Sequence, residues 1–119
     1  MQTVAQPITL DKVAIDFPEL KIIGIHIGHP WTEEMISMAW KHPNVFIGTD
    51  AHLPKYWDKS LIKFINSRGQ DKVMFGTDYP VIGFKRAMDE LDKLELREVP
   101  KRKLLVENAV RVYGLEKWA

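Results

Sequence analysis

The chain contains no cysteine among its 119 residues. This absence excludes a disulfide framework and any metal site built on thiolates, and it fits a protein of the reducing cytoplasm. The sequence also has no apolar run near 18 residues and no signal-peptide pattern. We therefore expect a cytoplasmic protein that neither spans a membrane nor is secreted.

A dominant charge of either sign is also lacking. Seventeen Lys and Arg oppose sixteen Asp and Glu, which leaves a net charge of +1, and no block of basic residues occurs. We therefore expect neither nucleic acid nor a membrane surface as a partner. The composition, 45% hydrophobic and 28% charged, is ordinary for a globular protein, and the length fits a single domain over residues 1–119.

Three short apolar runs organise the sequence: Lys21–His26, Asn44–Thr49 and Lys72–Thr77. Each run is bounded by turn residues and followed by a helical pattern, which predicts strands that alternate with helices. The predicted helices cover residues 10–17, 32–40 with Thr32 as N-cap, a segment that begins after Asp58, a segment from Phe84 to Leu94, and one from about Pro100 to before Gly114. This order predicts an α/β fold with three consecutive parallel βα units and a helix at each end.

The third run ends on Asp78, which an aromatic residue and a proline follow at once, and the first run ends on His26. The carboxyl ends of buried parallel strands are common places for catalytic groups, so both residues are candidates for a site. Asp78 could instead be a turn residue that bonds its own backbone, and His26 could be a core histidine. Asp50 rivals Asp78, because Gly48-Thr49-Asp50 repeats the sequence Gly76-Thr77-Asp78.

Strand alternation makes a sharper prediction for the site. It places Gly24 and His26 on one face of the first strand, and Gly76 and Asp78 on one face of the third. In an eight-stranded (β/α) barrel, alternate strands contribute to the same interior layer. We therefore expect the two glycines to share one layer and His26 and Asp78 to share the layer above, where both point into one pocket.

Four motifs in this order resemble the amidohydrolase-related family that includes aminocarboxymuconate-semialdehyde decarboxylase and the resorcylate decarboxylases. They are IHIGHPW at Ile25–Trp31, PNVF at Pro43–Phe46, RGQDKVMFGTDYP at Arg68–Pro80 and ENA at Glu107–Ala109. The resemblance covers the C-terminal third of the family. It implies that the chain is the last part of a TIM-type (β/α)8 barrel, with the three predicted strands as strands six, seven and eight.

The resemblance also implies a catalytic divalent metal, zinc or manganese, in a full-length protein. Asp78 matches the family's metal-ligating aspartate, and His26 matches a histidine that acts in acid/base chemistry beside the metal. The family's remaining ligands, an H-x-H pair on strand one and a histidine on strand five, have no counterpart in this chain. The chain also has His29 where the family usually has Gly or Tyr, and Gly48-Thr49-Asp50 where Asp-Thr-Ser is common.

Four further residues are candidates for contacts with a small-molecule substrate. His29 and His52 follow strand ends, although loop histidines are more often merely solvated. Trp31 and Tyr79 could line a pocket for a planar molecule, although packing is the commoner role of such rings. His42 precedes a strand, on the opposite side of a barrel from the catalytic rim, and is expected to be structural.

Three functional hypotheses follow from the resemblance. In the first, the chain is part of an enzyme that hydrolyses a small carbonyl substrate such as an amide or lactone, or that decarboxylates an aromatic or muconate-type acid. In the second, it is an inactive relative that binds no metal and acts as an interaction module. In the third, a partner chain or a homo-oligomer completes the barrel. Three strands alone are expected to expose two sheet edges.

Overall fold

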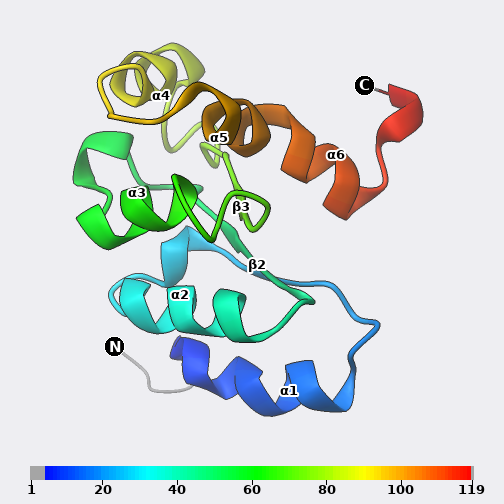
Figure 1. Cartoon of the computed structure of the whole chain (residues 1–119). Coiled ribbons are helices and arrows are strands. Elements are labelled where there is room, and N and C mark those ends of the chain that lie inside the picture. Colours follow the sequence, from blue (N-terminus) through cyan, green and yellow to red (C-terminus); the bar gives the residue numbers. More distant parts are fainter. Residues whose placement is uncertain (1–4, 119) are drawn as a thin grey trace.

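The computed structural model describes residues 5–118 and contains one parallel sheet with the strand order β1-β2-β3 (Figure 1). The strands are β1 (Ile22–Gly24), β2 (Val45–Gly48) and β3 (Val73–Met74). The expected α/β fold with three parallel βα units is therefore confirmed. The strands are shorter than the apolar runs that predicted them, because the chain turns away soon after each pairing ends.

The helices follow the predicted order: α1 (Leu10–Asp16), α2 (Thr32–Lys41), α3 (Lys59–Ile65), α4 (Phe84–Leu91), α5 (Glu98–Arg102), a π turn (Lys103–Glu107) and α6 (Asn108–Tyr113). Asp58 caps α3 by accepting a hydrogen bond from the backbone N–H of Ser60. Gly114 ends α6 in the left-handed conformation, with φ of 66°. The prediction for Thr32 was wrong by one position, since Trp31 is the N-cap of α2 and Thr32 is buried in the first turn.

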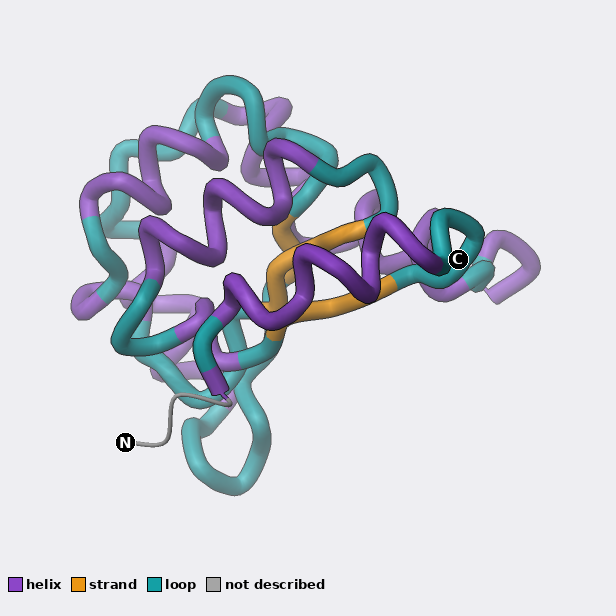
Figure 2. Tube along the Cα trace, turned by 90° about the horizontal axis from the view of Figure 1, so that it is seen from below, coloured by secondary structure: helices purple, strands orange, loops and turns teal. Residues whose placement is uncertain are grey.

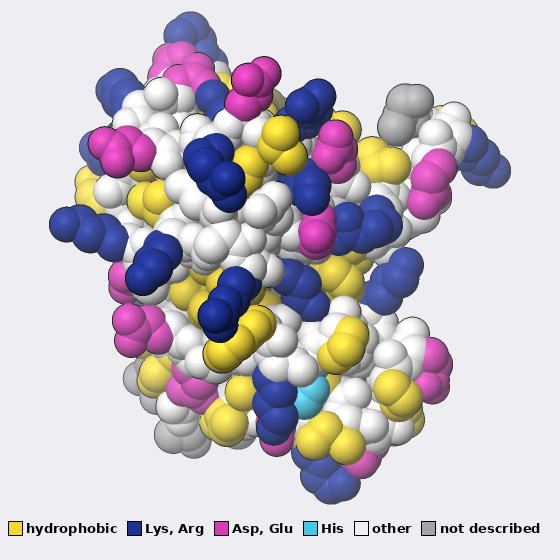
Figure 3. All heavy atoms as spheres, in the orientation of Figure 1, with side chains coloured by type: hydrophobic (Ala, Val, Ile, Leu, Met, Phe, Trp, Pro, Cys, Tyr) yellow, Lys and Arg dark blue, Asp and Glu magenta, His cyan; other side chains and the backbone are white. Residues whose placement is uncertain are grey.

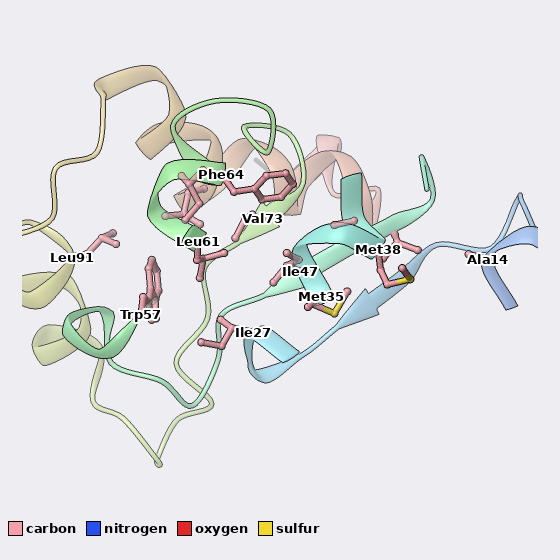
Figure 4. Packing of buried hydrophobic residues seen from close by; sticks show 14 residues of the cluster. Ala14, Ile27, Met35, Met38, Ile47, Trp57, Leu61, Phe64, Val73 and Leu91 are labelled. Carbon is pink, nitrogen blue, oxygen red and sulfur yellow. The ribbon is translucent and has the colours of Figure 1, made fainter. Parts of the chain in front are cut away.

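One face of the sheet packs against α2 and α3 and holds the larger core. Val45, Ile47 and Val73 from the strands are at most 1% exposed. Met35 and Met38 of α2 and Leu61 and Phe64 of α3 pack in the same cluster (Figure 4). Each side chain buried in this way stabilises the fold by about 1.5–3 kcal/mol relative to exposure.

The opposite face of the sheet carries a smaller cluster. Phe46 and Met74 pack there with Val112 of α6, and Ile23 and Ala109 lie at the edge of the cluster. Figure 2 shows the strands at the centre of the molecule with helices on several sides. Beyond this cluster, the sheet and α6 enclose an open hollow of about 280 Å³ that reaches Asp50.

The register of the sheet shows that the side chains of the first strand face the opposite sides from those predicted. Gly24 pairs with Ile47, which pairs with Val73, so all three face the helices. A Cβ placed on Gly24 would lie 2.2 Å from the Sδ atom of Met35 in α2. Gly24 therefore makes room for α2 and does not share a layer with Gly76.

The outer edge of β3 is closed by the C-terminal helical segment, contrary to the expectation of two open edges. The carbonyl of Val73 accepts a hydrogen bond from Asn108 Nδ2 at 2.8 Å. The N–H of Phe75 donates to the carbonyl of Leu104, within the π turn, at 3.0 Å. These groups point away from β2, because Lys72 and Met74 supply the carbonyls that bond β2.

Both basic and acidic side chains lie on the face shown in Figure 3, and the basic ones predominate across its middle. Within residues 5–118, no helix has the length and apolar character needed to cross a bilayer.

Replacing Asn108 tests the closure of the β3 edge. Asn108 is fully buried and its amide donates to the carbonyls of Gln70 and Val73. We expect Asn108→Ala to lower the free energy of unfolding by about 1–3 kcal/mol, since two carbonyls lose their donor. The control Glu107→Ala removes an exposed side chain and should change it by less than about 0.5 kcal/mol. Equal urea midpoints for Asn108→Ala and Glu107→Ala would contradict a role of Asn108 in covering the outer edge of β3.

A second stability prediction concerns the end of α2 opposite the strand tips. Asp11 of α1 accepts hydrogen bonds from Lys41 at 2.8 Å and from the buried His42 at 2.7 Å, so His42 is structural as expected. These two bonds hold the pKa of the Asp11 carboxyl below its ordinary value of 3.8. The stabilisation is therefore complete above pH 3.8 and is lost as pH falls through the lower pKa of the folded state.

We expect Asp11→Asn to be less stable than the wild type at neutral pH and the difference to shrink below about pH 4. Urea unfolding measured from pH 7 down to pH 3 gives this comparison. Glu19→Gln, an exposed change in the following loop, serves as the control. A constant difference across the whole pH range would show that the ionised Asp11 carboxylate is not the source of the stabilisation.

Candidate functional site

The chain turns sharply where each strand ends, and it does so through residues in the left-handed backbone conformation. His26 and Asp78 both have φ of 57°, and Ala51 has φ of 66°. A non-glycine residue in this conformation costs roughly 1–3 kcal/mol and persists only where the surrounding structure enforces it. Such residues gather at functional sites, and here they follow all three strands at one edge of the sheet.

His26 is held by Asp50 through both its backbone and its ring. Asp50 Oδ1 accepts a hydrogen bond from the N–H of His26 at 3.2 Å. Asp50 Oδ2 lies 3.1 Å from Nδ1 of the imidazole, and the carbonyl oxygen of Asp50 lies 3.4 Å from the same nitrogen. The contact therefore fixes both the main chain and the ring of His26.

Two glycines and a threonine form the space that Asp50 occupies. A Cβ on Gly48 would lie 3.2 Å from Asp50 Oδ1, and a Cβ on Gly76 would lie 3.3 Å from the Cβ of Asp50. The fully buried Thr49 bonds the carbonyl of Met74 at 3.3 Å and accepts from the N–H of Gly76 at 3.2 Å. The ends of β2 and β3 are thus tied together around Asp50.

Asp78 completes the group. One ligand atom each from His26, Asp50 and Asp78 can be chosen so that all three lie within 4.8 Å of one another. The structure therefore brings His26 and Asp78 together, as the sequence predicted. His26 reaches this position because the chain turns at His26. The two residues do not share a strand layer, since the side chains of β1 face the opposite sides from those predicted.

Two predicted contact residues lie beside this group. The rings of His29 and His52 have centroids 4.9 Å apart, and the ring of His52 is 6.4 Å from that of His26. Burial lowers the pKa of His52, and His29 and His26 lower it further, whereas Asp50 acts in the opposite direction. His52 consequently favours the neutral form, which can accept as well as donate a hydrogen bond.

Trp31 and Tyr79 lie outside the group. Trp31 precedes α2 and lines a separate hollow with Glu33 and Asp58. Tyr79 is 65% exposed and stacks on Phe84 with centroids 5.1 Å apart.

Asp50 is the member of the site whose contact with His26 the sequence did not predict. The repeated Gly-Thr-Asp was the signal available, since it placed a second carboxylate at the same point after a neighbouring strand. The sequence could not rank Asp50 against Asp78, because the side-chain directions depend on the two turns.

Two carboxylates and an imidazole are donors that suit divalent cations of the zinc and manganese class. The separation of at most 4.8 Å lets one ion approach the three side chains. The exposed carboxylate of Asp78 therefore suits a divalent metal, and the partly exposed imidazole of His26 leaves a nitrogen for proton transfer beside it.

Comparison with known proteins gives a family and one informative structure. The model of a protein family described as "Amidohydrolase" matches residues 1–115. No curated protein matches the chain. An uncharacterised TIM-barrel protein from Bordetella bronchiseptica superposes with a TM-score of 0.84 at 28% identity. The alignment covers 94% of this chain and 40% of that protein, so this chain spans about two fifths of its length.

A glycine substitution tests the space around Asp50. In Gly76→Ala the added carbon meets the Cβ and backbone of Asp50, whereas in Gly83→Ala it meets no atom within 4 Å. We expect Gly76→Ala to lower the free energy of unfolding by about 1 kcal/mol or more and Gly83→Ala to change it by clearly less. Urea unfolding of both variants measures this difference, and a Gly76→Ala protein as stable as the wild type would contradict the close packing.

Proposed function

Because this chain belongs to the amidohydrolase family, we propose that it supplies the C-terminal part of a metal-dependent barrel enzyme that hydrolyses a small carbonyl substrate, such as an amide or lactone. The observation that carries the proposal is the convergence of His26, Asp50 and Asp78 within 4.8 Å at the carboxyl ends of three parallel strands. In a barrel of this type, that edge is where catalytic groups gather.

Asp78 is the residue that would hold the metal, zinc or manganese. Its side chain is exposed at the strand tip, and it makes no ion pair in the part of the chain that the structure describes. When bound, the ion would supply Lewis-acid polarisation of the substrate carbonyl. A catalytic zinc usually takes three protein ligands, so we propose that residues outside this chain complete the set, in a longer protein or in a partner chain.

His26 is the proposed proton carrier. Imidazoles accept and return protons near neutral pH, and the His26 side chain is 43% exposed, which leaves its second ring nitrogen accessible. During hydrolysis His26 would take a proton from the attacking water and return it to the leaving group. Asp50 would keep the ring in place during both transfers.

The space beside the site suits a small substrate. A hollow of about 280 Å³ on the barrel-facing side of the sheet extends from Met74 and Tyr113 to Asp50. His52, whose ring centroid is 6.4 Å from that of His26, and the neighbouring His29 are the proposed contacts for polar groups of the substrate.

Metal binding by a protein in which the barrel is complete tests the role of Asp78. We expect Asp78→Asn to weaken the affinity for Zn²⁺ or Mn²⁺ at least about tenfold, measured by isothermal titration, because a neutral amide replaces an anionic ligand. Asp89→Asn, which alters an exposed carboxylate paired with Lys85, should bind the metal as the wild type does. An unchanged affinity in Asp78→Asn would remove this residue from the metal site.

Turnover tests the reaction itself. A protein in which the barrel is complete should hydrolyse an amide or lactone in the presence of the metal, and Asp78→Asn should lower kcat by at least about 100-fold. Release of carbon dioxide from an aromatic acid, with no hydrolysis, would instead assign the site to decarboxylation.

A further inference from the structure

We propose that Asp50 is a positioning residue that fixes His26 in the tautomer with the proton on Nδ1, so that Nε2 is the nitrogen presented to the reacting atoms. The catalytic meaning of this inference rests on the proposed function. The tautomer itself is a property of the chain without metal or substrate and can be measured separately.

The first argument comes from the chemistry of the atoms around Nδ1. Asp50 Oδ2 lies 3.1 Å from this nitrogen and the carbonyl oxygen of Asp50 lies 3.4 Å from it. An ionised carboxylate and a carbonyl are both acceptors only. A favourable contact with either therefore requires a proton on Nδ1, which in a neutral imidazole leaves Nε2 as the acceptor.

The second argument is that Asp50 cannot easily turn away from His26. Its other carboxylate oxygen accepts from the N–H of His26 at 3.2 Å, so the side chain is held by both oxygens. Gly48 and Gly76 border it closely, as the 3.2 Å and 3.3 Å approaches of their hypothetical Cβ atoms show. The same backbone bond supports the left-handed turn at His26, with φ of 57°, that aims the ring toward Asp50.

The third argument separates Asp50 from Asp78. The Asp50 side chain is 21% exposed and directed at His26, whereas Asp78 is exposed and forms no side-chain ion pair within residues 5–118. Both oxygens of Asp50 contact His26, which favours Asp50 as the residue that orients the histidine and Asp78 as the one available to a cation. The two carboxylates therefore have different roles.

Ring-¹⁵N-labelled histidine gives a direct test, because the chain has only four histidines and His26→Gln identifies the signal of His26. The chain is kept metal-free with a chelator, at a pH where His26 is neutral. Two-bond ¹⁵N–¹H correlation spectra then distinguish a protonated Nδ1 from a protonated Nε2. Free neutral histidine favours the proton on Nε2, so a protonated Nδ1 at His26 is the signature of an acceptor that holds it.

We expect the wild type to show a protonated Nδ1 at His26, and Asp50→Ala and Asp50→Ser, which lack a carboxylate at that nitrogen, to shift the population toward a protonated Nε2. Asp78→Asn should keep the wild-type tautomer, although it loses metal affinity. This contrast distinguishes failure of the present inference from failure of the proposed function. Dispersed amide spectra confirm that each variant is folded.

Two results would overturn the inference. One is a protonated Nε2 at His26 in the wild type, which requires no variant to fold. The other is an unchanged tautomer in both Asp50→Ala and Asp50→Ser, which would show that the Asp50 carboxylate does not hold the proton on Nδ1.

Discussion

The site depends on how the chain leaves three paired strands at one edge of the sheet. Parallel pairing brings the ends of β1, β2 and β3 together, but it does not by itself direct any side chain toward another. The left-handed residues His26, Ala51 and Asp78 supply those directions. Their backbone is unfavourable in isolation, so the contacts around Asp50 and the hydrogen bonds of Thr49 must hold it.

The C-terminal helical segment has a separate role in the fold. The π turn after α5 presents the carbonyl of Leu104 to Phe75, and Asn108 bonds the carbonyl of Val73. A two-residue strand has few ladder bonds, so these side bonds account for much of its hydrogen bonding. The segment thereby steadies β3 at the base of the turn that carries Asp78, without contributing a ligand atom to the His26–Asp50–Asp78 group.

The sequence predicted the order of the elements and the two outer members of the site, because both leave local signals. Apolar runs bounded by turn residues marked the strands, and Asp58 and Gly114 marked helix ends. The phase of the first strand was not predictable from alternation, because a strand of three residues that ends in Gly24 has little pattern to read. What decides that phase is Met35, eleven positions away on α2, which requires the space that a glycine leaves.

The two Gly-Thr-Asp sequences show why position after a strand does not determine a role. In the loop after β3, the left-handed residue is Asp78 itself, and the carboxylate lies exposed at the tip. In the loop after β2, the left-handed residue is Ala51, one position later, so Asp50 stays in line with its strand and faces His26. A shift of one residue in the turn thus gives identical tripeptides different surroundings. We propose that the carboxylate of Asp78 is available to a cation while that of Asp50 is held by the imidazole of His26, and a site that handles both metal and protons would need each kind.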